Sequence, residues 1–190
     1  MSFAFKEWRV VVEALGSGEQ ILILRKGGIA EKTGEFQIEA GRFWLFPTEF
    51  HAQREKTKLA AARWLLSSPA AIPTGSAASP AFDTTITLLY FAEIVHHAFL
   101  DNWPEVAALD PHHFWAESAV REKFDWSEPP GLHALVVRVH RLHEPLTVPV
   151  TPEMGGCKSW IEIPYSTYEY ASAPVLDGRS FDLRRRSTGL

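Results

Sequence analysis

Residues 16–28 read GSGEQILILRKGG, and the other segments can be placed around this stretch. Ile21 to Leu24 form a short continuous apolar run, which predicts a buried strand over 20–24. The glycines before the run end a predicted amphipathic helix over 5–15, whose apolar residues recur at steps of three and four. Two cations, Arg25 and Lys26, close the strand, and the two glycines that follow predict a sharp turn.

The rest of the chain predicts further strands and helices in an irregular order. Helices and strands do not alternate, which argues against a doubly wound parallel sheet. The pattern favours an α+β fold in which helices flank a curved, barrel-like mixed sheet. The expected elements are strands over 36–39 and 42–46 joined as a hairpin, a helix over 49–66, a strand over 85–95, a helical turn over 103–109, a helix over 113–124, extended segments over 131–142 and 146–150, and a strand over 159–163.

The length and composition predict one domain with its own core. The chain has 190 residues, of which 46% are hydrophobic and 22% are charged, so it is not a disordered tail. We expect a single domain over 1–164. Within it, residues 67–82 are rich in Ser, Pro, Ala and Gly and predict a flexible insertion. Residues 165–190 predict a peripheral C-terminal tail that contains a run of three arginines.

Charge and cysteine content exclude several classes of protein. The net charge is −4, with ten basic against eight acidic residues over 1–63 and nine against fifteen over 64–190, which is no nucleic-acid signature by itself. Cys157 is the single cysteine, so a disulfide within the chain and a multi-cysteine zinc site are excluded. The start lacks the pattern of a signal peptide and no apolar run would span a bilayer, so we expect a cytoplasmic protein without membrane contact.

The candidate site residues begin with the cationic turn. Arg25 and Lys26 beside Gly27 and Gly28 would combine two charges with exposed backbone N–H groups, which suits a phosphate. The spacing differs from that of a nucleotide-binding P-loop. The structural alternative is a tight turn with solvated charges.

Other candidates are histidines and tryptophans at the ends of elements. His51 and His113 each stand at the start of a predicted helix and beside an aromatic residue, where they would contact a polar or planar ligand. Trp115 and Trp160 would stack a base, and Lys158 would add a phosphate contact. Each of these residues has a packing role as its alternative. Among the histidines, adjacent pairs on strands point to opposite faces, so neither a metal nor another cofactor is expected.

Six stretches together resemble a known bacterial family. They are KEWRVVVEAL, QILILRKGGIAEKTG, FWLFPTEFHAQ, LDPHHFWAESAVREKF, GLHALVVRVHRLHEP and GGCKSWIEI, within residues 4–163. In this order they resemble domain of unknown function 1802. Some relatives look fused to restriction-endonuclease-like domains, so the resemblance implies nucleic-acid work and a nuclease partner.

A more distant resemblance concerns the fold. A helix that leads through Gly18 into a strand ending at Arg25 is similar to the opening of PUA-like and ASCH domains, which are small β-barrels that bind RNA or modified bases. The resemblance implies a module that binds RNA, single-stranded DNA or a modified nucleotide. ASCH amidohydrolases with a Lys-Thr pair after the glycine are one alternative, although Glu19 and Gln20 stand in this place. The other alternative is an adaptor for a nuclease. Because a resemblance in fold does not establish a function, we predict no reaction for this chain.

Overall fold

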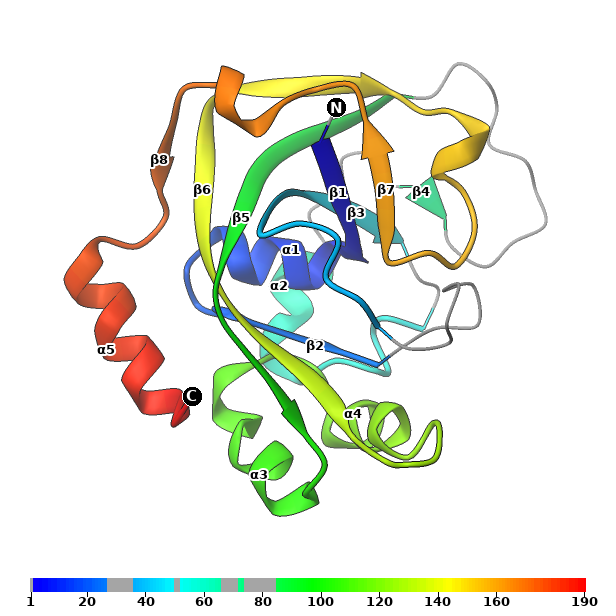
Figure 1. Ribbon diagram of the computed structural model, residues 1–190, viewed down its shortest axis with the longest axis vertical. Coiled ribbons are helices and arrows are strands. Elements are labelled where there is room, and N and C mark those ends of the chain that lie inside the picture. The colour runs from blue at the N-terminus through cyan, green and yellow to red at the C-terminus, as the bar shows by residue number, and fades with distance from the viewer. Residues whose placement is uncertain (1, 27–35, 50–51, 66–71, 74–84) are drawn as a thin grey trace.

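The computed structural model describes residues 2–26, 36–49, 52–65, 72–73 and 85–190 (Figure 1). None of the helices in these ranges is both long and apolar enough to span a bilayer. The elements are β1 (Ser2–Trp8), α1 (Arg9–Gly16), β2 (Leu22–Arg25), β3 (Arg42–Glu49), α2 (Ala62–Leu65), β4 (Ile72–Pro73), β5 (Thr85–Leu100), α3 (Trp103–Ala108), α4 (Glu117–Phe124), β6 (Leu132–Pro149), β7 (Trp160–Ile163), β8 (Ser172–Pro174) and α5 (Gly178–Thr188), with short 3₁₀ turns over Leu59–Ala61, Asp110–His112, Pro152–Met154 and Thr167–Glu169.

The strands form one curved, mixed sheet in the order β2-β6-β5-β3-β1-β7. β1 and β3 run parallel, β4 adds parallel to β3, and β8 pairs antiparallel with β6. The long strands β5 and β6 run antiparallel, and their register shifts between Leu88 and Tyr90 and again between Ile94 and His96. Such irregularities bend strands and increase their twist, and Figure 1 shows the two strands sweeping together through the whole molecule. The predicted α+β fold with a curved mixed sheet and flanking helices is confirmed.

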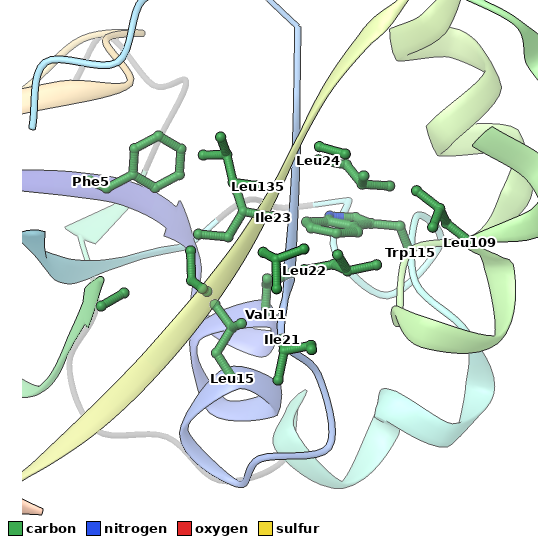
Figure 2. Packing of buried hydrophobic residues seen from close by; sticks show 14 of the residues in the cluster. Phe5, Val11, Leu15, Ile21, Leu22, Ile23, Leu24, Leu109, Trp115 and Leu135 are labelled. Carbon is green, nitrogen blue, oxygen red and sulfur yellow. The ribbon is translucent and has the colours of Figure 1, made fainter. Parts of the chain in front are cut away.

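The core consists of two clusters of buried side chains. The larger one fills the space between α1, β2 and the lower parts of β5 and β6, and Figure 2 shows Trp115 inserted among Leu22, Leu24 and Leu109. The smaller one contains Trp44, Phe46 and Phe91. The sheet separates the two, because Ala4 belongs to the smaller cluster and its neighbour Phe5 to the larger.

The beginning of the chain differs from the predicted helix over 5–15. Residues 2–8 form β1, and the helix α1 starts only at Arg9. β1 lies between β3 and β7 and is buried on both faces, so it lacks the alternation of a half-buried strand. Trp8 fits the helical spacing of the apolar residues that follow it. The apolar pattern therefore predicts a helix that starts too early in the chain.

The predicted hairpin and the helix over 49–66 are also wrong. Residues 36–40 form no strand, and β3 continues through Pro47, which lies opposite Glu7 in the parallel ladder with β1. In the described part of 49–66, turns precede the short helix α2, since Lys56 and Lys58 exchange backbone hydrogen bonds with Phe114 and Ala116. This pairing also leaves 113–116 extended, so α4 begins at Glu117. Most of the predicted insertion lies outside the described residues, and Ile72–Pro73 form β4.

The C-terminal segment carries more structure than a peripheral tail. β8 pairs with β6, and Asp177 caps the start of α5 by accepting a hydrogen bond from the Ser180 N–H. α5 lies at the side of the molecule (Figure 1), but its Phe181 is buried in the larger cluster. The segment therefore contributes to the hydrophobic core.

We predict that Phe181→Ala lowers the free energy of unfolding by about 3 kcal/mol, as is usual for removal of a buried aromatic ring. The matched control is Leu183→Ala in the same helix, where a side chain that is 57% exposed is lost and the cost should stay below about 0.5 kcal/mol. Urea denaturation of both variants measures the difference. Equal costs would show that α5 does not stabilise the domain through Phe181.

Candidate nucleic-acid interface

Arg25 connects the two ends of the sheet. It is the last residue of β2, at one end of the strand order, whereas β1 and β7 lie at the other end. Its Nη2 donates to the Lys6 carbonyl of β1 at 3.0 Å, and its Nε donates to Ser159 Oγ, just before β7, at 3.3 Å. The guanidinium also lies 4.9 Å from the centre of the Phe5 ring. We call this junction the seam.

Glu7 is the buried acid of the seam. It is 1% exposed, and its Oε1 accepts the backbone N–H of Trp8 at 2.8 Å. Its Oε2 lies 3.8 Å from Arg25 Nη1, too far for a hydrogen bond, and makes no hydrogen bond within the described part of the chain. The sequence pattern gave no reason to select Glu7, because it was placed on a helix.

Lys6, next to Glu7 in the chain, holds the loop before β7. Its Nζ donates to the carbonyl oxygens of Met154 at 2.9 Å and Gly156 at 2.6 Å. Burial lowers the pKa of Lys6 to about 8, and the nearby charges of Lys158 and Arg25 act in the same direction. This anchoring brings the exposed Lys158 to the seam.

The amine of Lys123 on α4 interacts with Glu7 through its charge. Lys123 is half-buried on α4, with its Nζ 5.1 Å from the Trp8 ring centre and 4.7 Å from that of Trp115. Burial lowers its pKa to about 8, while the charge of Glu7 opposes this shift. Among the described residues the amine makes no hydrogen bond. Sequence reasoning missed Lys123 because only the tertiary fold brings α4 to the end of β1.

The predicted cations Arg25, Lys26 and Lys158 form what we call the cationic rim. Lys26 follows β2 and its Nζ donates to the Pro129 carbonyl at 3.0 Å, while burial lowers its pKa. The charge of Lys26 lowers the pKa of His133, and the charge of Lys158 lowers that of Lys6. Both lysines therefore lie in the surroundings of the seam. The predicted glycines 27 and 28 lie outside the described residues.

Beside the rim lies a group of partly exposed rings, the ring surface, made by His97, Phe99, His133 and Trp160. His133 lies opposite Arg25 in the β2–β6 ladder. Its ring stacks on that of His97 at 5.1 Å and lies 4.9 Å from Phe99, while the buried Phe36 connects it to Trp160. The Trp160 indole is fixed by a 2.8 Å hydrogen bond from Nε1 to the Gln37 carbonyl.

Burial lowers the pKa of both histidines of the ring surface, which favours their neutral forms. The pKa of His133 falls to about 4, and the two rings share a 2.9 Å contact between Nε2 of His97 and Nδ1 of His133. Neutral imidazoles offer flat surfaces for stacking. Within the described residues no group of three or more His, Cys, Asp or Glu side chains is arranged to hold a metal ion.

Two predicted contact residues lie in the interior instead. Trp115 is fully buried, so in this structure no ligand can stack on it. His113 is 4% exposed beside it, with ring centres 5.6 Å apart, and burial lowers its pKa to about 4. They were chosen for their place at a helix start, but α4 begins four residues after His113. His51 lies outside the described residues.

Arg25 should stabilise the domain, in contrast to the solvated charge of a simple turn. Arg25→Ala removes the seam contacts and leaves the buried Glu7 without its cation, so we predict a loss of about 3 kcal/mol in the free energy of unfolding. Lys26→Ala should cost less than about 0.5 kcal/mol, since it removes one exposed contact. Denaturant titration of the two variants measures this, and a tolerated Arg25→Ala would contradict the seam.

His113 should make stability depend on pH. Its folded pKa of about 4 lies below the usual histidine pKa of 6.5, so its contribution to stability is complete above pH 6.5 and is lost as the pH falls towards 4. The loss should approach about 3 kcal/mol at most, from 1.4 kcal/mol per pKa unit. We expect His113→Leu to flatten the decline of stability between pH 6.5 and 4. Parallel curves for the two proteins would show that His113 is protonated in the folded state.

Three comparisons place the chain among known proteins. The family model described as "Domain of unknown function (DUF1802)" matches residues 4–187. No curated protein matches the chain. Among solved structures, an ASCH protein from Zymomonas mobilis is 15% identical, with 75% of this chain and 68% of that chain covered and a TM-score of 0.41. A single-residue mutant of that protein is 15% identical, with 77% and 73% covered and a TM-score of 0.42. Similarity at this level supports no conclusion about a ligand or a reaction.

Proposed function

We propose that this chain, which belongs to the family of domain of unknown function 1802, is a module that binds single-stranded RNA or DNA or a modified nucleotide. The observation that carries the proposal is the position of the cationic rim directly beside the ring surface. Arg25 and Lys26 end the strand whose ladder partner, His133, belongs to that surface. Cations next to flat rings are the two parts from which proteins build sites for single strands.

Each part has a separate task in this proposal. Lys26 and Lys158 attract phosphate groups, whereas Arg25 fixes the seam and presents its remaining charge to the same place. The rings of Phe99, His97 and Trp160 accept the faces of bases, and stacking of this kind contributes about 1–3 kcal/mol per base. The neutral state of the two histidines suits stacking better than phosphate binding.

An ASCH-like amidohydrolase is less well supported. Glu19 and Gln20 stand in the place of the Lys-Thr pair of such enzymes, and Gln20 is fully buried. Its Nε2 donates to the Leu22 carbonyl at 2.6 Å, and its Oε1 accepts the Phe114 N–H at 3.1 Å. Both polar atoms of the Gln20 amide are thus engaged, the oxygen by the segment 113–116 and the nitrogen by β2. An association with a nuclease is a separate proposal that rests on the family resemblance, and co-purification with a neighbouring nuclease would test it.

The test is a fluorescence anisotropy titration of labelled eight-residue DNA and RNA strands at salt concentrations from about 50 to 200 mM. We predict that the double variant Lys26→Ala/Lys158→Ala binds at least about tenfold more weakly at low salt. The slope of log K against log salt should become smaller by about 1.4, since each phosphate contact on a single strand contributes about 0.7.

The matched control is Arg54→Ala/Arg179→Ala, which removes the same charge from two exposed positions outside the rim. If both double variants lose the same binding affinity, the loss reflects net charge alone and contradicts a specific site at the rim. Absence of binding by the unaltered protein at low salt would overturn the proposed function.

A further inference from the structure

Glu7 has an unused hydrogen-bond acceptor in the interior of the seam. Its side chain is fully buried, yet Oε2 has no hydrogen-bond donor within the described part of the chain. Burial of a charged oxygen without a donor is costly, and such groups are rare in folded proteins. The backbone N–H of Trp8 fixes the other oxygen, so the orientation of the carboxyl group is set before any ligand arrives.

The surroundings of this oxygen contain donors that are only partly used. Arg25 Nη1 lies 3.8 Å away, which is close enough for charge attraction but too far for a hydrogen bond. The Lys123 amine interacts with Glu7 through its charge and makes no hydrogen bond among the described residues. The place therefore combines one vacant acceptor with two cationic donors, beside the indole rings that Lys123 covers.

This set of groups is complementary to one edge of a nucleobase. An exocyclic amino group donates hydrogen bonds, and the ring nitrogen or carbonyl next to it accepts them. Adenine and cytosine carry such an edge. Uracil carries a carbonyl oxygen where cytosine carries its amino group, and this oxygen would repel the Glu7 carboxylate. Proteins that read single strands commonly recognise unstacked bases through this edge.

We propose that Glu7 selects amino-bearing bases over uracil by accepting a hydrogen bond from the exocyclic amino group, while Lys123 and Arg25 face the adjacent acceptor. This proposal rests on the proposed function, because the rim and the ring surface must first bind the strand. Arg25 links Glu7 to the ring surface. Its guanidinium lies on the ring of Phe5, and that ring is 4.8 Å from the ring of Trp160. Because the Glu7 side chain is fully buried, a base reaches its Oε2 only after a neighbouring side chain moves aside. We assign this movement to Lys123, whose long side chain is restrained by no hydrogen bond within the described residues.

The experiment compares the unaltered protein on (dC)8 and (dU)8, which have equal charge and differ in the bases only at the amino or carbonyl group and the adjacent ring nitrogen. We expect about tenfold tighter binding of (dC)8, the size of one hydrogen bond to a charged group. A Gln side chain donates as well as accepts, so Glu7→Gln should bind (dU)8 better than the unaltered protein does and bring the two dissociation constants within about twofold. A role of Glu7 in packing alone would weaken binding of both strands equally.

The control is Glu162→Gln, an exposed carboxyl group on β7, which should keep the preference for (dC)8. Equal binding of the two strands by the unaltered protein overturns the selection by Glu7 and leaves the proposed function standing, whereas no binding of either strand overturns the proposed function itself. If a thermal melt shows that Glu7→Gln folds poorly, equal binding of the two strands by the unaltered protein still overturns the selection by Glu7.

Discussion

One guanidinium group links the two ends of a sheet whose end strands are not paired by backbone hydrogen bonds within the described residues. The strand order runs from β2 to β7, and Arg25 spans between these ends by donating to the β1 backbone and to Ser159. The planar fork of arginine suits this task, because its donors point in fixed directions towards different acceptors. The β1–β3 ladder positions Lys6 and Glu7, Lys6 holds the loop before β7, and Arg25 adds the connection from β2 to both.

The seam places several charged groups in a poorly solvated region. Burial lowers the pKa of both Lys6 and Lys123 to about 8, and the charge of Glu7 favours the protonated form of Lys123. Lys6 is satisfied by two backbone carbonyls, whereas Glu7 and Lys123 keep unused hydrogen-bonding capacity. Perturbed groups of this kind gather at functional sites. Lys6 therefore holds the fold, whereas Glu7 and Lys123 are the groups to which we assign a ligand.

The sequence predicted what depends on local patterns. The apolar run before Arg25, the long strands β5 and β6 and the helix α3 follow from periodicity and turn residues. β1 was missed because both of its faces are buried, which removes the alternation on which the prediction of a strand depends. Rim residues could be chosen because cations beside glycines are visible in the sequence. Glu7 and Lys123 could not, because residues 116 positions apart meet only through the tertiary fold.

The register shift near Leu88 lets one strand, β5, contribute to both core clusters. This restricts where relatives can insert or delete residues. Ile86 and Leu88 face the smaller cluster, whereas Tyr90 and Ala92, also even-numbered, face the larger one. The irregularity thus reverses the alternation of side chains midway along β5. Loss or gain of one residue there would send each apolar side chain of one half of the strand to the wrong side of the sheet. Relatives should therefore differ in length at their loops, while the spacing between these two halves of β5 stays constant.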